Sequence, residues 1–274
     1  MIRPATLSLN AIIGGAIIAL LVVVIAVSLV WTPFDPLAVD IRARLKPPSA
    51  VHWLGTDEFG RDILSRAMVG ARTSAAIALA TVLFATLGGT LVGVLSGFTG
   101  GFADRLLMAL NNTLLAFPGV LLALALMVVL GAGERGVVLA LGLAYLPSVA
   151  RVVRGAVLSL RETAFVEASF VIGNGAMFTM ARHVVPNLVA PLTVLATSMF
   201  GWVLLSESAL SFLGLGVPPP APTWGNMLAG SRPHIQSAVW LGLVPGACIT
   251  LTMLGINLLG DAMRDRFDPR MAAA

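Results

Sequence analysis

The chain has 274 residues, of which 58% are hydrophobic and only 11% are charged, and its net charge is +4. Soluble globular domains carry about 25% charged residues, so this composition excludes an ordinary soluble domain and indicates a membrane protein. The basic residues lie between apolar runs, as in membrane proteins, so the charge does not indicate a nucleic-acid partner. The single cysteine, Cys248, excludes an internal disulfide, and three widely separated histidines give no support to a metal site.

A helix that spans the roughly 30 Å hydrocarbon core needs about 20 mostly apolar residues. Six runs meet this length, at residues 7–30, 74–97, 106–130, 137–158, 188–213 and 238–259. The first run is too long for a signal peptide and lacks a small-x-small cleavage site, so we interpret it as a retained anchor. We therefore expect an all-α integral membrane protein with six transmembrane helices and both termini on one side.

The distribution of basic residues predicts the orientation of the chain, because cytoplasmic loops carry an excess of lysine and arginine. The termini share one face with a charged segment at residues 154–186, and that face holds Arg151, Arg154, Arg161, Arg182, Arg264, Arg266 and Arg270. The opposite face has its basic residues in the first long segment, mixed with acids, at Arg42, Arg44, Lys46, Arg61, Arg66 and Arg72. We expect both termini and segment 154–186 to lie in the cytoplasm.

Small residues and prolines within the spans predict how the helices pack. Glycines spaced by four residues let helices approach closely, and they occur at Gly89, Gly93 and Gly97 and again at Gly242 and Gly246. Pro118, Pro147 and Pro245 lie within spans, where a proline either kinks the helix to line a pathway or only packs. No repeat divides the chain, so we expect an anchor helix with an extracytoplasmic segment at residues 1–73 and one membrane domain of five helices at 74–274.

The sequence contains no motif for nucleotide binding or catalysis. The phosphate-binding pattern GxxxxGK[ST] requires a lysine after glycine, whereas the only lysine, Lys46, follows Leu45. A GxGxxG pattern at 131–136 follows an apolar span rather than a β-strand, so we interpret it as a turn between the third and fourth spans. No nucleophile elbow and no intramembrane pair of acids is present. We therefore expect a protein that is not an enzyme.

Glu207 is the one acid within a predicted span. A carboxyl group in lipid is costly and is often functional, which suggests a proton relay or a contact with the transported solute. The alternative is a structural carboxylate near the outer third of the helix, capped by Ser206, Ser208 or a partner subunit. The two interpretations differ in their consequence, because a structural carboxylate tolerates Glu207→Gln without a change in the pH dependence of transport.

Segment 154–186 interrupts the apolar chain with charges and a Gly-Asn-Gly sequence. Residues 164–172 have helical composition, Gly173 and Gly175 can leave the helical region, and residues 176–182 resume a short helix before Pro186 sets the entry to the fifth span. The result is a helix-turn-helix outside the membrane with a small apolar face at Ala168, Phe170, Met177 and Met180. Such a surface helix is typical of one that docks in a groove of a partner.

This segment resembles the EAA loop of ABC importer permeases, whose pattern is E-A-A-x3-G followed by I-x-L-P. The matching positions are Glu167, Ala168, Gly173 and Pro186. The departures are Ser169 for the second alanine, His183 for the isoleucine and Val185 for the leucine. Four further segments, at 52–74, 114–126, 209–228 and 257–270, resemble the C-type subunit of the dipeptide/oligopeptide/nickel permease group. The resemblance covers all but about the first 50 residues.

The resemblance implies a permease subunit of an ATP-driven importer of the bacterial inner membrane, for di- or oligopeptides, nickel or a peptide-like solute. Its partners would be a homologous second permease, two cytoplasmic ATPase subunits that bind ATP and Mg²⁺, and an extracytoplasmic solute-binding protein. The first long loop and residues 217–232 would face the binding protein. The residues that couple the permease to the ATPase would be Glu162, Glu167, Ala168, Ser169, Gly173 and Pro186. The alternative is a proton-coupled secondary transporter that uses Glu207.

Overall fold

The computed structural model describes residues 9–267, in which helices are joined by short loops and one long segment at 29–62. Within this range five helices are long and apolar enough to cross a membrane. They are α1 (Leu9–Ser28), α2 (Ile63–Thr99), α5 (Glu134–Arg161), α8 (Val189–Phe212) and α10 (Trp240–Phe267). They match five of the six predicted spans. Leu7, Arg270 and the side chain of Arg266, used in the predictions above, lie outside the described part.

The third predicted span, 106–130, is sharply bent at Pro118, one of the prolines that the sequence places within a span. Its two halves are α3 (Gly101–Leu115) and α4 (Gly119–Leu130), which meet at an angle of 94°. The bend occurs at Pro118, which has no N–H to donate and disfavours the helical conformation of the residue before it. Pro118 instead begins α4, and its carbonyl accepts a hydrogen bond from Leu122 N at 3.0 Å. Counted as one broken span, the pair completes six crossings.

Helix α2 begins earlier than predicted, because Asp62 caps its first turn. The Asp62 carboxylate accepts hydrogen bonds from Ser65 N at 2.8 Å and from Ser65 Oγ at 2.7 Å. The first turns of α2 contain the charged residues Arg66 and Arg72. For this reason the predicted apolar run began only at Ser74, although the backbone is already helical from Ile63. The boundary between residues 73 and 74 therefore falls inside α2.

Helices α2 and α5 pack closely along the predicted glycine row of α2. A Cβ atom at Gly93 would lie 2.7 Å from Val153 Cβ, and one at Gly97 would lie 3.0 Å from Val157 Cβ. These valines are fully buried in the largest apolar cluster of the described residues. The structure thus confirms that small residues let these two helices approach.

The second predicted glycine pair contributes to packing at one position only. A Cβ built at Gly242 would lie 3.1 Å from Oγ of Ser231, the residue that ends the helix Trp224–Gly230, whereas no atom of the described residues lies within 4 Å of one at Gly246. Helices α1 and α10 instead meet through other glycines, because a Cβ at Gly14 or Gly255 would clash with the facing helix. The spacing of glycines in the sequence did not predict this contact, because the prediction requires knowing that α1 and α10 are neighbours.

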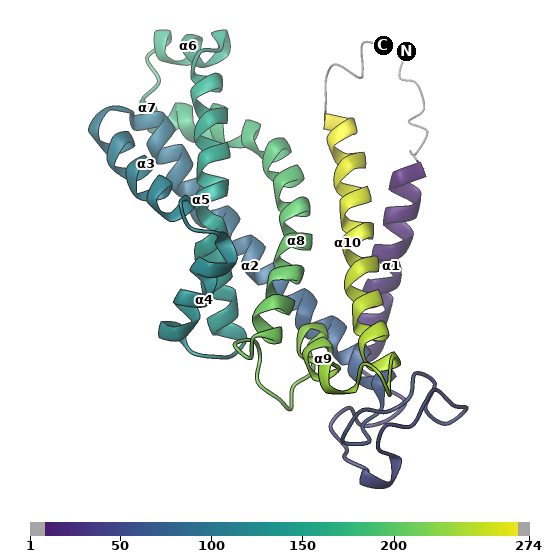
Figure 1. Ribbon diagram of the computed structural model, residues 1–274. Coiled ribbons are helices and arrows are strands. Elements are labelled where there is room, and N and C mark those ends of the chain that lie inside the picture. Colours follow the sequence, from purple (N-terminus) through teal and green to yellow (C-terminus); the bar gives the residue numbers. More distant parts are fainter. Residues whose placement is uncertain (1–8, 268–274) are drawn as a thin grey trace.

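The two ends of the bundle carry different elements, as Figure 1 shows. One end, which we call the α6 end, holds α6 (Ala164–Val171) and α7 (Ala176–Thr179), together with the first turn of α1 and the last turn of α10. The opposite end, the α9 end, holds the long segment 29–62 and α9 (Trp224–Gly230). This arrangement is the one that an even number of crossings requires. Short 3-10 turns lie at Ile41–Ala43 and Arg232–His234.

Candidate functional site

At the α6 end, segment 154–186 folds as the helix-turn-helix that the sequence predicts. The turn between α6 and α7 depends on Gly173, whose φ is +91°, a conformation that residues with a Cβ rarely adopt. Gly173 N donates to Phe170 O at 2.9 Å. Gly175, in contrast, has a φ of −69°, which any residue can adopt, so only one of the two predicted glycines is needed for the backbone. Neither would meet an atom within 4 Å of an added Cβ.

Hydrogen bonds of Ser169 join α6 to α7. The Ser169 side chain is 3% exposed, and its Oγ lies 2.9 Å from Thr179 Oγ1 and accepts from Asn174 Nδ2 at 3.1 Å. An alanine, as in the family pattern, could form neither contact. The serine at position 169, in place of the family's alanine, therefore affects the buried contact between α6 and α7 and not the exposed surface of the loop.

The chain after α7 stays helical up to α8. A π-helical turn at Met180–Val184 and a 3-10 turn at Val185–Leu188 connect them, so the stretch from Ala176 to Phe212 is helical throughout. Pro186 lies in the 3-10 turn, where its missing N–H breaks the regular hydrogen-bond ladder. The short second helix that the sequence predicts is thus the start of the fifth span.

Polar contacts fix this loop to the rest of the bundle. Arg161, at the end of α5, donates from Nη1 to Gly97 O at 2.8 Å and lies over the Phe98 ring at 5.8 Å. About two turns earlier in α5, Arg154 forms two hydrogen bonds of 2.6 Å with Asp104 of α3. These contacts join α2, α3 and α5 next to the loop.

The surface of the helix-turn-helix presents an apolar patch. We call it the loop patch, and its members are Phe165, Phe170, Val171, Ile172, Met177 and Phe178, with exposed fractions from 44% to 87%. Ala168 is exposed beside it, whereas Met180 is only partly exposed and packs against the apolar core. The prediction that Met180 belongs to the exposed apolar face is therefore wrong, because its side chain packs against the core instead.

The predicted coupling residues are distributed unevenly over this loop. Glu162 ends α5, and Glu167 and Ala168 lie in α6, all three exposed. Ser169 is buried between α6 and α7, as described above. Pro186 is exposed but lies in the 3-10 turn after α7 rather than in α6 or its turn. The structure thus places three of the six together on the surface of α6 and its approach.

Glu207, the second candidate, lies in α8 toward the α9 end and is 1% exposed. Its Oε1 accepts hydrogen bonds from Ser211 Oγ at 2.9 Å and from Thr223 Oγ1 at 3.0 Å. The two serines proposed to cap it do not do so, since Ser206 Oγ lies 2.8 Å from the Tyr145 hydroxyl and Ser208 Oγ donates to Leu204 O. Among residues 9–267 no partner is found for Oε2, and no basic side chain forms an ion pair with this carboxyl.

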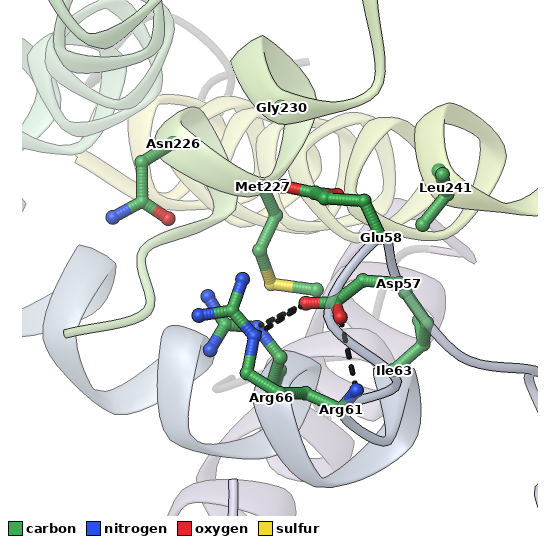
Figure 2. Close-up of a pocket in the computed structure, with 9 residues that line it drawn as sticks. All are labelled: Asp57, Glu58, Arg61, Ile63, Arg66, Asn226, Met227, Gly230 and Leu241. Carbon is green, nitrogen blue, oxygen red and sulfur yellow. Dashed lines mark hydrogen bonds and ion pairs between the residues drawn. The ribbon is translucent and has the colours of Figure 1, made fainter. Parts of the chain in front are cut away.

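A small polar cavity at the α9 end was not apparent from the sequence. Figure 2 shows Asp57 between Arg61 and Arg66, at N–O distances of 2.6 and 3.6 Å, with Asn226 and Met227 of α9 on the other side. Its volume of about 40 Å³ suits one or a few water molecules. Its charges are largely paired within the chain. In the described part of the chain no group of three or more histidine, cysteine or acidic side chains could hold a metal ion.

The matched family model covers residues 89–273 and describes an inner membrane component of binding-protein-dependent transport systems. The di/tripeptide transport system permease protein of Pseudomonas aeruginosa is 42% identical over 269 residues, 96% of this chain and 89% of that protein. The glutathione transport system permease protein of Shigella flexneri is 42% identical over 259 residues, 94% of this chain and 86% of that protein.

The fold also resembles a solved structure. The methionine ABC transporter MetNI in an inward-facing conformation contains a chain that matches with a TM-score of 0.59 and 21% identity, over 72% of this chain and 94% of that one. At this identity the match concerns the fold alone. The relatives, in contrast, share more than 40% of their residues over nearly the full length of this chain. The chain therefore belongs to the family of inner membrane components of binding-protein-dependent transport systems, and it is a multi-pass permease subunit of an ABC importer, not an enzyme.

Proposed function

We propose that this permease carries di- or tripeptides, or a closely related small peptide, across the inner membrane of a bacterium. The observation that supports this most strongly is the identity of 42% over almost the whole chain to a di/tripeptide permease and to a glutathione permease. Both of those solutes are short peptides with a charged amine and carboxylates. Nickel, which the sequence resemblance left open, has no such support. A proton-coupled secondary transporter is not favoured either.

The loop patch would seat α6 and α7 in a cleft of an ATPase subunit, with the α6 end in the cytoplasm. Ile172 and Met177 are 80% and 73% exposed, which is costly for large apolar side chains that lie outside the bundle and have no partner. The residues that would serve this contact are Glu162, Glu167 and Ala168 on the surface, with Ser169, Gly173 and Pro186 as its internal supports. ATP binding would draw the coupling loops of two permeases together and change which side of the membrane is open.

The partners would be a homologous second permease, two cytoplasmic ATPase subunits that bind ATP and Mg²⁺, and an extracytoplasmic solute-binding protein. The last would dock at the α9 end, on segment 29–62 and residues 217–232. These two regions lie side by side in space, since Asp57 and Glu58 line the cavity of Figure 2 together with Asn226 and Met227 of α9. No cofactor would bind to this chain itself.

The solute is tested by reconstitution of the complete complex in proteoliposomes, with the partner subunits encoded by neighbouring reading frames. Uptake of a labelled dipeptide, a labelled tripeptide, glutathione and ⁶³Ni²⁺ is compared in the presence of ATP. We expect ATP-dependent uptake of one or more peptides and none of nickel. Nickel uptake alone, or uptake that persists without the ATPase subunits and collapses with the proton gradient, would contradict the proposal.

The coupling role is tested by placing a charge in the loop patch. Ile172→Glu should abolish co-purification of the ATPase subunits, because a carboxylate would be buried in an apolar contact. Val51→Glu is the matched control, since Val51 is similarly exposed, at 65%, but lies at the α9 end. Both variants should insert normally in the membrane. Retention of the ATPase by Ile172→Glu would refute the assignment of α6 and α7 as the coupling element.

A further inference from the structure

The first turn of α9 is wedged between α2 and α8. On the α2 side, Trp224 is 3% exposed, its backbone N donates to Ser74 Oγ at 3.0 Å, and its ring Nε1 donates to Ala67 O at 3.0 Å. On the α8 side, the Thr223 hydroxyl donates to Glu207 Oε1. The same hydroxyl accepts from Asn226 N at 3.0 Å and so caps α9. Helix α9 is therefore attached to both neighbouring membrane helices through its own N-terminal turn.

Close backbone approach makes the contact with Glu207 tight. A Cβ atom at Gly225 would lie 2.8 Å from Glu207 Oε2 and 2.8 Å from Ser208 Cα. Only glycine allows α9 to lie so close to α8, because real Cβ atoms do not approach other atoms at that distance. The carboxyl group of Glu207 is thus enclosed between the two helices, with no path to solvent (1% exposed).

Helix α9 also touches the long segment 29–62. Met227 and Asn226 line the polar cavity of Figure 2 together with Asp57 and Arg66, and Gly230 packs near Glu58. Through these contacts the segment, α9, α2 and α8 are connected at one end of the molecule. Helix α9 therefore offers a direct route by which a displacement of the segment can reach α8.

The Glu207 side chain joins two elements through one acceptor, because Oε1 takes hydrogen bonds from Ser211 of its own helix and from Thr223 at the start of α9. The rest of this buried group is costly, since Oε2 has no hydrogen-bond partner among the described residues. Such groups within membrane spans are retained where they serve a function. The hydrogen bonds of Glu207 lead to α9 and to its own helix, so a function served by these bonds acts between α8 and α9.

We propose that Glu207 is a positioning residue that latches α9 to α8, so that segment 29–62, α9 and the adjoining ends of α2 and α8 move as one rigid body in the import cycle. The latch transmits docking of the solute-loaded binding protein to α8. Helix α8 is joined to α7 by the π and 3-10 turns at the other end of the bundle, where the ATPase contact is proposed. This inference rests on the proposed function as an ABC importer with a binding protein.

The test compares Glu207→Ala, Glu207→Gln and Thr223→Val in the complete complex, with Ser208→Ala as matched control. Ser208 is equally buried in α8, but its hydroxyl bonds only within the helix. The measurement is the stimulation of ATP hydrolysis by loaded binding protein, relative to basal hydrolysis. Glu207→Ala and Thr223→Val should reduce the stimulation about fivefold or more while basal hydrolysis stays unchanged. Glu207→Gln, which keeps an acceptor oxygen, and Ser208→Ala should behave as wild type.

Two results would overturn the latch. The first is that stimulated and basal ATP hydrolysis fall together in Glu207→Ala and Thr223→Val, or that neither rate changes. Either outcome would show that Glu207 does not relay docking of the binding protein. If Glu207→Gln is as impaired as Glu207→Ala, the ionisable proton of Glu207 is needed rather than its hydrogen bond. A wild-type complex that no peptide-loaded binding protein stimulates would instead count against the proposed function.

A second measurement does not depend on the solute. Spin labels are placed at Leu213, directly after α8, and at Ile235, after the 3-10 turn that follows α9; these residues are 58% and 61% exposed. The labels report the distance between the end of α8 and the chain that leaves α9. In a Cys248→Ala background the distance distribution should be narrow, and it should broaden with Glu207→Ala or Thr223→Val but not with Ser208→Ala. An equally narrow distribution in all variants would refute the latch even if transport is lost.

Discussion

The substitution Gly173→Ala isolates the backbone requirement of the turn between α6 and α7. Gly173 has a φ of +91°, and no atom lies within 4 Å of an added Cβ, so the only penalty is conformational. An L residue held in the left-handed region costs about 1–2 kcal/mol, which lowers the population of the native turn by a factor of roughly 5–30. Gly175→Ala is the matched control, because its φ of −69° suits alanine and its surroundings are equally open.

The consequence for the loop follows from the hydrogen bonds that the turn makes. If the turn rearranges, Gly173 N loses its bond to Phe170 O and Asn174 N loses its bond to Ser169 O at 3.1 Å. Helix α7 would then shift relative to α6, and the loop patch would no longer form one surface. We expect Gly173→Ala to reduce transport and ATPase attachment several-fold, Gly173→Asn to be intermediate, and Gly175→Ala to have no effect.

The assay is peptide uptake by proteoliposomes, normalised to the amount of inserted permease, with co-purified ATPase measured in the same samples. Asparagine tolerates positive φ better than alanine, so the order glycine, asparagine, alanine is the signature of a backbone effect. Equal activity of Gly173→Ala and Gly175→Ala, with normal insertion of both, would refute the reasoning. An effect of Gly175→Ala as large as that of Gly173→Ala would also do so.

Further substitutions test the packing and the polar contacts. Gly93→Val should destabilise the detergent-solubilised protein by about 1–3 kcal/mol through overpacking against α5, whereas Gly246→Ala should be neutral or slightly stabilising, both measured by thermal unfolding. Ser169→Ala restores the family pattern but removes the hydrogen-bond partner of Thr179. The variant should therefore lose the attached ATPase at a lower temperature than wild type. Asp104→Asn loses the charge that binds its arginine partner on α5, which should cost about 1 kcal/mol because the pair is partly exposed, and high salt should shrink the difference. A Gly246→Ala penalty equal to that of Gly93→Val, or an effect of Asp104→Asn that grows with salt, would contradict these assignments.

Local features of the fold followed from the sequence because they depend on short-range chemistry. The apolar runs fixed the number and approximate positions of the spans, since each crossing needs its own length of apolar chain. The helix-turn-helix at 154–186 followed from charge, composition and the glycines, and the turn at Gly173 is a property of one residue. The glycine row of α2 was recognisable because its spacing alone places it on one face of a helix.

Only the tertiary structure decided the features that depend on which elements meet. The 94° bend at Pro118 was ambiguous in the sequence, because a proline within a span can be absorbed or can break it, as Pro147 in the continuous α5 shows. The partner of Glu207 is Thr223, 16 residues away in another element, and not a neighbouring serine. Met180 packs against the apolar core and not on the exposed face, which its spacing in the sequence did not reveal. The sequence by itself determines which segments are apolar enough to cross a membrane. Long-range packing decides which side chains face one another, and the contact of Glu207 with Thr223 between α8 and α9 depends on that packing.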